Sequence, residues 1–469
     1  MKSRSEPRPK SNRAARRSGD PRATALEVLT RIESSKLTLD SVMETTVESN
    51  SPVSRRDRAL LNALVYGVLR WRGKLDWIIS QFSKSPIKKI SPEILNILRL
   101  GLYQILYLDR VPVSAAVNTS VELAKRSSAP WAAGFVNGVL RNAARNPQRT
   151  TCCHLDGKRG PATLAITGSL PVWLIERWLK RFGTDSTQTL CEALNTIPPI
   201  TIRANSLKTD RATLQRALEQ LVEKPLPGQV TTEAISFRRP SCPIIEMKPF
   251  KDGWFQVQDE SAQLISWLLE PQPGETVLDA CAGLGGKTGH IAQLMQNQGQ
   301  IIAVDKAEKK LIALKSEMNR LGISIVKTRQ IDLQQPPETS TLPAFDRILL
   351  DAPCSGLGVL RRNPDTRWNR CESDLRHYQA RQIRLLTNLA PLVKPTGWIV
   401  YAVCSSEPEE GEAVIRAFLK SNPKFTLCSR ALSLNEKHFG LIDENGFLST
   451  YPNFPELDGF FAARLQRLE

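Results

Sequence analysis

The feature that most constrains the fold of this chain is a regular alternation of short apolar runs and amphipathic patterns after Gln263. Short runs that are apolar throughout are typical of strands buried on both faces of a parallel sheet. The intervening patterns repeat apolar residues with helical spacing. The sequence therefore predicts a doubly wound α/β domain, with strands at 276–280, 300–304, 324–329, 346–351 and 397–403 and helices that include 307–321 and 376–393.

The residues before this domain differ in composition from segment to segment. The N-terminal arm is basic and lacks apolar periodicity, which predicts disorder, and it serves either solubility or RNA contact. A long helical pattern follows, with Leu60, Leu64 and Val68 in one stripe and Ser54 as a helix cap. We expect a multidomain protein: disordered arm 1–20, all-α bundle 21–146, linker 147–169, small α+β domain 170–262 and α/β domain 263–469.

The overall composition limits the class of protein. The chain has 469 residues, more than one hydrophobic core usually holds, and its net charge of +17 favours a polyanionic partner. Its nine cysteines form no CxxC pair and only four histidines are present, so free thiols in a reducing cytoplasm are expected. Cys152, Cys153 and His154 could bind a metal, but no further ligands follow at finger spacing. Without a membrane-spanning run or an apolar signal region, we expect a cytoplasmic protein. We also expect it to be monomeric and to bind no metal.

Two cysteines come directly after predicted buried strands. Cys354 lies in the segment Asp351-Ala-Pro-Cys-Ser-Gly, and Cys404 lies in Tyr401-Ala-Val-Cys-Ser-Ser. Open α/β sheets build their active sites where such strands end. One thiol there is a candidate nucleophile, and two suggest separate attack and release steps. A cysteine is also a small buried hydrophobe, so either one alone would be ambiguous.

A glycine-rich segment joins the first predicted strand to the next helix. It runs Cys281-Ala282-Gly283-Leu284-Gly285-Gly286-Lys287. Small residues let a ligand approach the backbone, and the following helix N-terminus offers free N–H groups to an anion. The segment nearly matches a P-loop, but Cys281 stands where the first glycine is needed, and it half matches a dinucleotide fingerprint.

Carboxylates at the ends of further strands favour a nucleoside cofactor. Asp305 ends the second strand, where a carboxylate can accept both hydroxyls of a ribose. Asp332 ends the third strand, near where an adenine would lie, although such acids are often only helix caps. A P-loop ATPase could use Asp351 for Mg²⁺, but Pro353-Cys354 would then have no explanation. Ribose, adenine and two thiols together indicate S-adenosylmethionine.

The two thiols suit methyl transfer to an unactivated carbon. C5 of a pyrimidine is a poor nucleophile until a thiolate adds to C6 and converts the ring to an enamine. The C5 proton must later be removed and the thiolate expelled, so two cysteines can divide the work. Asp351 at N3 and the exocyclic amine of cytosine would favour the addition. Because the base must be unstacked, single-stranded or flipped nucleic acid is expected.

These segments resemble the RNA cytosine-C5 methyltransferases of the Nol1/Nop2/Sun family. The resemblance covers the chain from residue 22 onward. The N-terminal bundle resembles the antitermination factor NusB, an RNA-binding fold that a bacterial subfamily acting on 16S rRNA carries. The most specific matches are Val257-Gln-Asp-Glu-Ser-Ala-Gln263, the glycine-rich segment, Asp351 to Trp368, Cys404-Ser405 with Pro408-Glu409-Glu410, and Asp458-Gly-Phe-Phe461.

The resemblance implies roles for individual residues. Cys404 would be the attacking nucleophile and Cys354 the release cysteine in a Rossmann-like methyltransferase domain. The segment from Cys281 to Lys287, with Asp305, Asp332 and Asp351, would contact the cofactor and the cytosine. The chain departs from the family pattern at Gly283-Leu284, Val403 and Gly411, but none of these changes removes a reactive group.

Two other functions remain open at this point. A DNA cytosine-C5 methyltransferase would use a Pro-Cys pair such as Pro353-Cys354 for attack, which leaves Cys404 and the bundle unexplained. An RNA-binding ribosome-assembly factor with a decayed site is a non-enzymatic alternative, against which the intact cysteines and carboxylates argue.

Overall fold

The computed structural model divides the chain into two compact units, Met1–Cys191 and Glu192–Glu469. It describes residues 19–35, 37–49, 54–151, 160–337, 342–428, 440–453 and 457–469. Residues 1–18 of the predicted arm and the Cys152-Cys153-His154 run lie outside the described residues. No helix in the described ranges combines the length and the apolar character that a membrane span requires.

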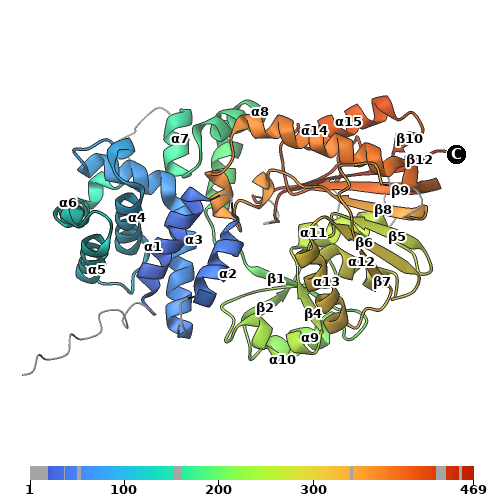
Figure 1. Ribbon diagram of the computed structural model, residues 1–469, viewed down its shortest axis with the longest axis horizontal. Helices are drawn as coiled ribbons and strands as arrows, with labels where there is room; N and C mark the ends of the chain where they lie inside the picture. The colour runs from blue at the N-terminus through green and yellow to red at the C-terminus, as the bar shows by residue number, and fades with distance from the viewer. Residues whose placement is uncertain are drawn as a thin grey trace, which may run out of the picture. The chain divides into compact units, whose positions relative to one another are not determined.

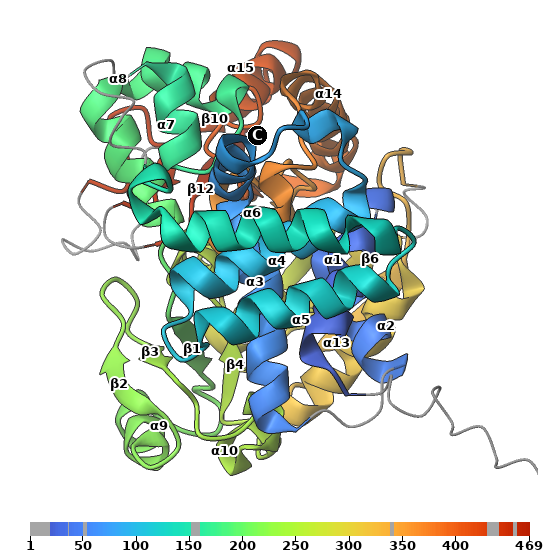
Figure 2. The same cartoon turned by 90° about the vertical axis from the view of Figure 1, so that its left-hand side faces the viewer.

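Unit 1 is helical, as the apolar periodicity predicts. Its helices are α1 (Pro21–Ser34), α2 (Leu39–Ser49), α3 (Arg55–Phe82), α4 (Pro92–Tyr107), α5 (Val113–Arg126), α6 (Ala133–Arg145), α7 (Pro161–Thr167) and most of α8 (Val172–Leu194). The most buried is α4, which packs against α3, α5 and α6 (Figure 2). The N-terminal cap of α3 is confirmed: Ser54 Oγ accepts a hydrogen bond of 3.2 Å from the backbone N–H of Asp57.

The segment predicted as a linker contains structure of its own. Helix α7 forms within it, with Pro161 at its first position and Gly168 after its last. Helix α7 contacts α3, and Ser169 Oγ accepts a 2.9 Å hydrogen bond from the N–H of Gly73 in α3. Residues 160–169 are therefore part of the helical unit. The two compact units divide at Cys191, near the end of α8.

Unit 2 begins with a small antiparallel sheet of order β2-β3-β1-β4. Its elements are β1 (Ile200–Ala204), α9 (Arg211–Leu218), β2 (Glu223–Pro227), β3 (Ala234–Arg238), α10 (Lys248–Lys251) and β4 (Phe255–Val257). Ile202, Ile235 and Phe237 form a core with Leu214 and Leu218 of α9. This sheet and its helices agree with the small α+β domain that the sequence predicts here.

The larger sheet of unit 2 has the order β10-β12-β9-β8-β5-β6-β7, with β11 paired to β12. The five predicted strands are parallel: β5 (Thr276–Ala280), β6 (Gln300–Asp305), β7 (Val326–Gln330), β8 (Phe345–Asp351) and β9 (Val393–Val403). Three antiparallel strands that the sequence does not predict extend it: β10 (Phe425–Leu427), β11 (Leu448–Thr450) and β12 (Phe460–Arg467).

Helices cover both faces of this sheet, which confirms the doubly wound prediction. They are α11 (Glu260–Leu269), α12 (Gly286–Leu294), α13 (Glu308–Leu321), α14 (Glu372–Leu389) and α15 (Glu412–Ser421). Side chains alternate along each strand, so Leu278 and Leu350 pack with α14 and α15 while Val277 and Leu349 pack with α11, α12 and α13 (Figure 1). Because β9, β8, β5 and β6 are adjacent and parallel, their C-terminal ends share one edge.

Candidate active site

The two predicted cysteines meet at this edge of the sheet. Asp351 is the last residue of β8 and Val403 the last of β9, so Cys354 and Cys404 follow on neighbouring chain segments. Their Sγ atoms are 3.0 Å apart, and both thiols are free. A hydrogen bond with Cys404, together with burial, raises the pKa of Cys354 well above its ordinary value. Cys354 therefore holds its proton and can donate a hydrogen bond to the sulfur of Cys404.

Lys287 and Asp351 form an ion pair beside the thiols. Lys287 Nζ lies 2.6 Å from Asp351 Oδ2 and 5.2 Å from the centroid of the Phe460 ring. Burial disfavours the charge of Lys287, but the attraction of Asp351 outweighs it and the pKa of Lys287 is raised, with a further contribution from Cys404. Lys287 thus carries a fixed positive charge that interacts with Cys404. Asp351 keeps a second oxygen for another partner.

The glycine-rich segment turns sharply between β5 and α12. Cys281, Gly283 and Gly285 all have positive φ angles, 62°, 59° and 85°. A side chain at Gly285 would also place a Cβ 2.7 Å from Leu314. Burial and the nearby carboxylates of Asp351 and Asp305 raise the pKa of Cys281 to about 12, so this thiol stays neutral.

Asp305 connects this turn to the end of β6. Its Oδ2 accepts a 3.1 Å hydrogen bond from the N–H of Gly283, and its Oδ1 accepts one of 2.8 Å from Ala307. Asp332 lies after β7, is exposed, and its Oδ1 accepts a 3.0 Å hydrogen bond from the N–H of Gln334. Asp332 therefore makes the kind of backbone-capping hydrogen bond that the sequence analysis gave as the alternative to a role in cofactor binding.

Cys281, Asp305 and Asp332 line one cavity of about 200 Å³. Carboxylates at its polar side suit ribose hydroxyls, and the apolar side chains suit a flat base, so the lining fits a nucleoside. The cavity also includes residues that the sequence does not single out, among them three cations. Its other lining residues are Val304, Lys306, Lys310, Ile331, Leu333, Gln334, Pro353, Arg381 and Leu385.

Asp279 is a further buried carboxylate that was not predicted as a site residue. It lies in β5, and its Oδ2 accepts a 2.5 Å hydrogen bond from Thr288 Oγ1 of α12. Burial raises the pKa of Asp279 to about 7, and the negative charges of Asp351 and Asp305 act in the same direction. The strand end therefore holds an acid that titrates near neutrality.

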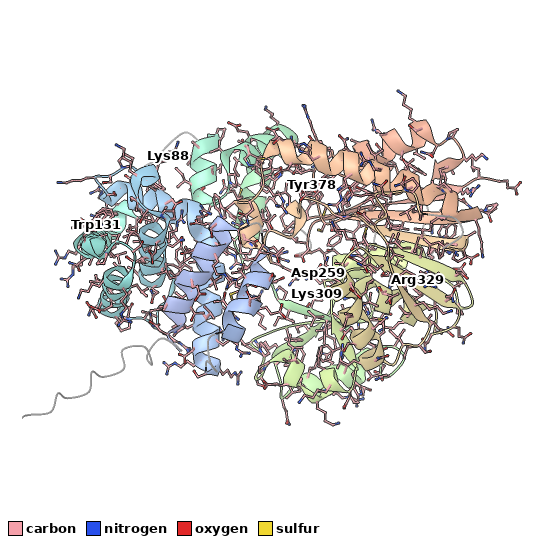
Figure 3. The ribbon with its side chains drawn as sticks, in the orientation of Figure 1. Lys88, Trp131, Asp259, Lys309, Arg329 and Tyr378 are labelled. Atoms are coloured by element: carbon pink, nitrogen blue, oxygen red, sulfur yellow. The ribbon has the colours of Figure 1, made fainter. Side chains whose placement is uncertain are left out.

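Backbone contacts lock the loop that follows Cys354. The N–H of Gly358 donates to the carbonyl of Cys404 at 3.0 Å, and the N–H of Gly459 donates to the carbonyl of Gly358 at 2.8 Å. Farther along, Arg362 binds Asp259 Oδ2 at 2.6 Å and Asp458 Oδ2 at 2.5 Å. Asp259, labelled in Figure 3, also caps α11. These contacts join three segments that are remote in sequence.

The three departures from the family pattern leave the reactive groups in place. Leu284 is 64% exposed and Val403 lies in the core. A Cβ at Gly411 would lie 3.0 Å from two atoms of the Phe461 ring, which suits the glycine found there. Each departure is therefore compatible with the local packing.

A doubly wound sheet with a glycine-rich turn, a carboxylate at the end of β6 and a cavity that fits a nucleoside is typical of enzyme domains that use a nucleoside cofactor. Family models agree with this class. They match 16S rRNA methyltransferase RsmB/F at residues 266–466, the NusB family at 20–145 and the RsmF/B-like ferredoxin-like domain at 170–244.

Curated relatives match over nearly the whole chain. The "probable ribosomal RNA small subunit methyltransferase B" of Bacillus subtilis is 36% identical over 452 residues, which cover 95% of this chain and 98% of that protein. The ribosomal RNA small subunit methyltransferase B of Escherichia coli is 35% identical, covering 88% and 91%. The chain therefore belongs to the ribosomal RNA small subunit methyltransferase B family.

Solved structures support the same fold. The crystal structure of PH0851 matches with a TM-score of 0.78 at 26% identity and covers 95% of this chain and 99% of that one. A methyltransferase homolog protein from Pyrococcus horikoshii matches with a TM-score of 0.55 at 29% identity, covering 65% and 98%. The predicted family and the three-part fold are thus confirmed.

Proposed function

We propose that this chain methylates C5 of one cytosine in 16S rRNA and uses S-adenosylmethionine as the methyl donor. The observation that carries the proposal is the 3.0 Å separation of the Cys354 and Cys404 sulfurs at the strand ends beside the Lys287–Asp351 pair. A single nucleophile would suffice for simple addition. Two adjacent thiols match a reaction in which a covalent bond to the base is first made and then broken.

The residues around the cavity would hold the cofactor, which when bound supplies an electrophilic methyl group. Asp305 would accept hydrogen bonds from the ribose, while Asp332 lines the same cavity. Cys281, Ala282, Gly283, Leu284, Gly285, Gly286 and Lys287 would present their backbone to it. The first N–H groups of α12 would face its carboxylate.

Cys404 begins the proposed reaction by forming a bond from Sγ to C6 of the cytosine. Lys287 would place a positive charge near the attacking sulfur, and Asp351 would bind N3 and the exocyclic amine through its second oxygen. Addition moves the electron pair of the C5=C6 bond to the C5 side, so C5 becomes the nucleophile that takes the methyl group.

Cys354 serves the release step, in which C5 loses its proton and the bond between Cys404 and C6 breaks. The thiol of Cys354 holds its proton in the resting site chiefly because of its hydrogen bond with Cys404. Once Cys404 is a thioether, that hydrogen bond is lost, Cys354 would release its proton to solvent, and the Cys354 thiolate would then take the C5 proton. Elimination then restores the aromatic ring and the Cys404 thiolate.

A single-turnover assay with methyl-labelled S-adenosylmethionine and protein-free 16S rRNA tests the proposal. We expect one labelled 5-methylcytosine per RNA molecule, in proportion to enzyme. RNA that is bound but never labelled would instead support an assembly factor with a decayed site. Label in double-stranded DNA but not in RNA would support the DNA methyltransferase alternative.

A further inference from the structure

A buried carboxylate, Glu410, lies behind the two thiols and has no role in the reaction described above. It is 0% exposed and precedes α15 by two residues. Placing a carboxylate in the interior is unfavourable unless hydrogen bonds satisfy both of its oxygens. The identity of its donors therefore indicates what this side chain does.

Both oxygens of Glu410 bind the residues that directly follow the two cysteines. Oε1 accepts a 2.8 Å hydrogen bond from the N–H of Ser355, and Oε2 accepts hydrogen bonds from Ser405 Oγ at 2.6 Å and from Ser355 Oγ. Ser355 follows Cys354, and Ser405 follows Cys404. One carboxylate thus joins the two cysteine-bearing loops through their serines.

Two further side chains hold Glu410 in this position. Gln382 of α14 donates from Nε2 to Glu410 Oε1 at 3.0 Å and to the carbonyl of Pro353 at 3.1 Å. The hydroxyl of Tyr401 donates to the backbone carbonyl of Glu410 at 2.5 Å. Because Tyr401 belongs to β9 and Gln382 to α14, the carboxylate is fixed to the rigid sheet and to a covering helix.

The chemistry of the donors explains why a carboxylate stands here. The Ser355 N–H must donate, and the Gln382 amide and the two serine hydroxyls donate in the observed arrangement. A carboxylate accepts on both oxygens, whereas a glutamine would direct one N–H₂ group at a donor pair. The separation of the two loops therefore depends on the charged acceptor and on its full side-chain length.

We propose that Glu410 is a positioning residue that sets the distance between the Cys354 and Cys404 sulfurs. This inference rests on the proposed function, in which both thiols act on the same base. Glu410 does not contact the base itself. It acts through Ser355 and Ser405, whose loops carry the thiols, and a change in loop position of about 1 Å is enough to slow a reaction by roughly 100-fold.

The test compares Glu410→Gln, Glu410→Asp and Glu410→Ala with the control Glu412→Gln, whose carboxylate pairs with Arg416 on the surface of α15. We expect single-turnover methylation to slow at least about tenfold in all three Glu410 variants, with Glu410→Ala slowest. Calorimetric affinity for S-adenosylmethionine should change less than about twofold, since Glu410 does not line the cofactor cavity. The control should match wild type.

A double-mutant cycle with Ser355→Ala/Ser405→Ala separates positioning from general stability. If Glu410 acts through the serines, Glu410→Gln should add little to the loss already caused by the serine pair. If Glu410→Ala does not fold, this cycle still tests the inference because it uses Glu410→Gln. Additive losses, or wild-type rates in the folded Glu410 variants, would overturn the inference. A wild-type enzyme that labels no RNA cytosine would instead overturn the proposed function.

Discussion

At the scale of single residues, charge is concentrated where parallel strands end. Asp305 and Asp351 end β6 and β8, and Asp279 is the second-last residue of β5 between them. Among the described residues, only Lys287 forms an ion pair with one of these three carboxylates. The order β8-β5-β6 brings these carboxylates to one edge. Their mutual repulsion is part of what raises the pKa of Asp279, and it gives the site measurable dependence on pH.

Asp305→Ala should weaken S-adenosylmethionine binding by about 2–4 kcal/mol, because two hydrogen bonds that the ribose hydroxyls would donate to its carboxylate would be lost. The variant also frees the N–H of Gly283 from its side-chain acceptor. Asp332→Ala is the matched control, because this exposed residue lines the same cavity. Its substitution should reduce the binding free energy of S-adenosylmethionine by less than Asp305→Ala does. Isothermal calorimetry measures both. Equal affinities for Asp305→Ala and wild type would remove Asp305 from the cofactor site.

Asp279 should make the folded protein less stable as pH rises. Its folded pKa of about 7 exceeds the ordinary value of 3.8, so its contribution is fully present below pH 3.8 and is lost as pH rises through 7. The full effect is on the order of 4 kcal/mol. Urea unfolding at pH 5 and pH 8 should show a smaller loss of stability for Asp279→Asn than for wild type. Identical pH dependence in the two proteins would refute this titration.

At the scale of elements, the sequence predicts what local periodicity encodes. Four of the five parallel strands contain a short apolar run, whereas β7 has only Val326 among polar residues, and the predicted positions of all five agree with the structure to within a few residues. Helix α7 was missed because it spans only seven residues between a proline and a glycine. Strands β10 and β11 were missed because three-residue strands carry almost no period.

In the candidate site too, local sequence predicts some positions and not others. The places of Cys354, Cys404 and Asp305 at this sheet edge could be predicted because each lies at or shortly after the end of a recognisable strand. Glu410 could not be assigned a role, because its partner Gln382 is 28 residues away on another helix. The cations Lys306, Lys310 and Arg381 were also missed, since their place in the cavity depends on how the helices pack against the sheet.

Gly358→Ala should disrupt the loop after Cys354. A Cβ there would lie 1.9 Å from the carbonyl oxygen of Gly459, and backbone atoms cannot rotate away. We expect a loss of about 2–4 kcal/mol in unfolding free energy together with loss of methylation. Gly138→Ala in α6 is the control, because nothing lies within 4 Å of its Cβ. Equal melting temperatures for Gly358→Ala and wild type would show that the loop can move.

At the scale of the whole molecule, the net charge of +17 means that exposed lysines and arginines outnumber acidic residues on some part of the surface. The bundle carries exposed cations at the turn between α3 and α4, where Lys84, Lys88 and Lys89 lie. Lys88 and the exposed Trp131 are labelled on this unit in Figure 3. Exposed cations on a NusB-like unit are of the charge that contacts with an RNA backbone require.

Lys88→Ala/Lys89→Ala should weaken 16S rRNA binding and reduce its salt dependence. Each lost phosphate contact lowers the slope of log K against log salt by about 0.7–0.9. Lys420→Ala/Lys424→Ala removes the same charge from the end of α15 and should change binding less. Filter binding at several salt concentrations compares the pairs. Equal slopes for the two variants would place the RNA contact elsewhere.

The two thiols provide the most direct test of the central claim, because they should fail in different ways. Cys404→Ser should form no covalent species, since a hydroxyl is a far weaker nucleophile than a thiolate. Cys354→Ser should still attack and methylate, and then remain attached to its product. Denaturing gels of each variant with 16S rRNA and S-adenosylmethionine should show a protein–RNA adduct for Cys354→Ser only. An adduct for Cys404→Ser but not for Cys354→Ser would contradict the assignment of attack and release.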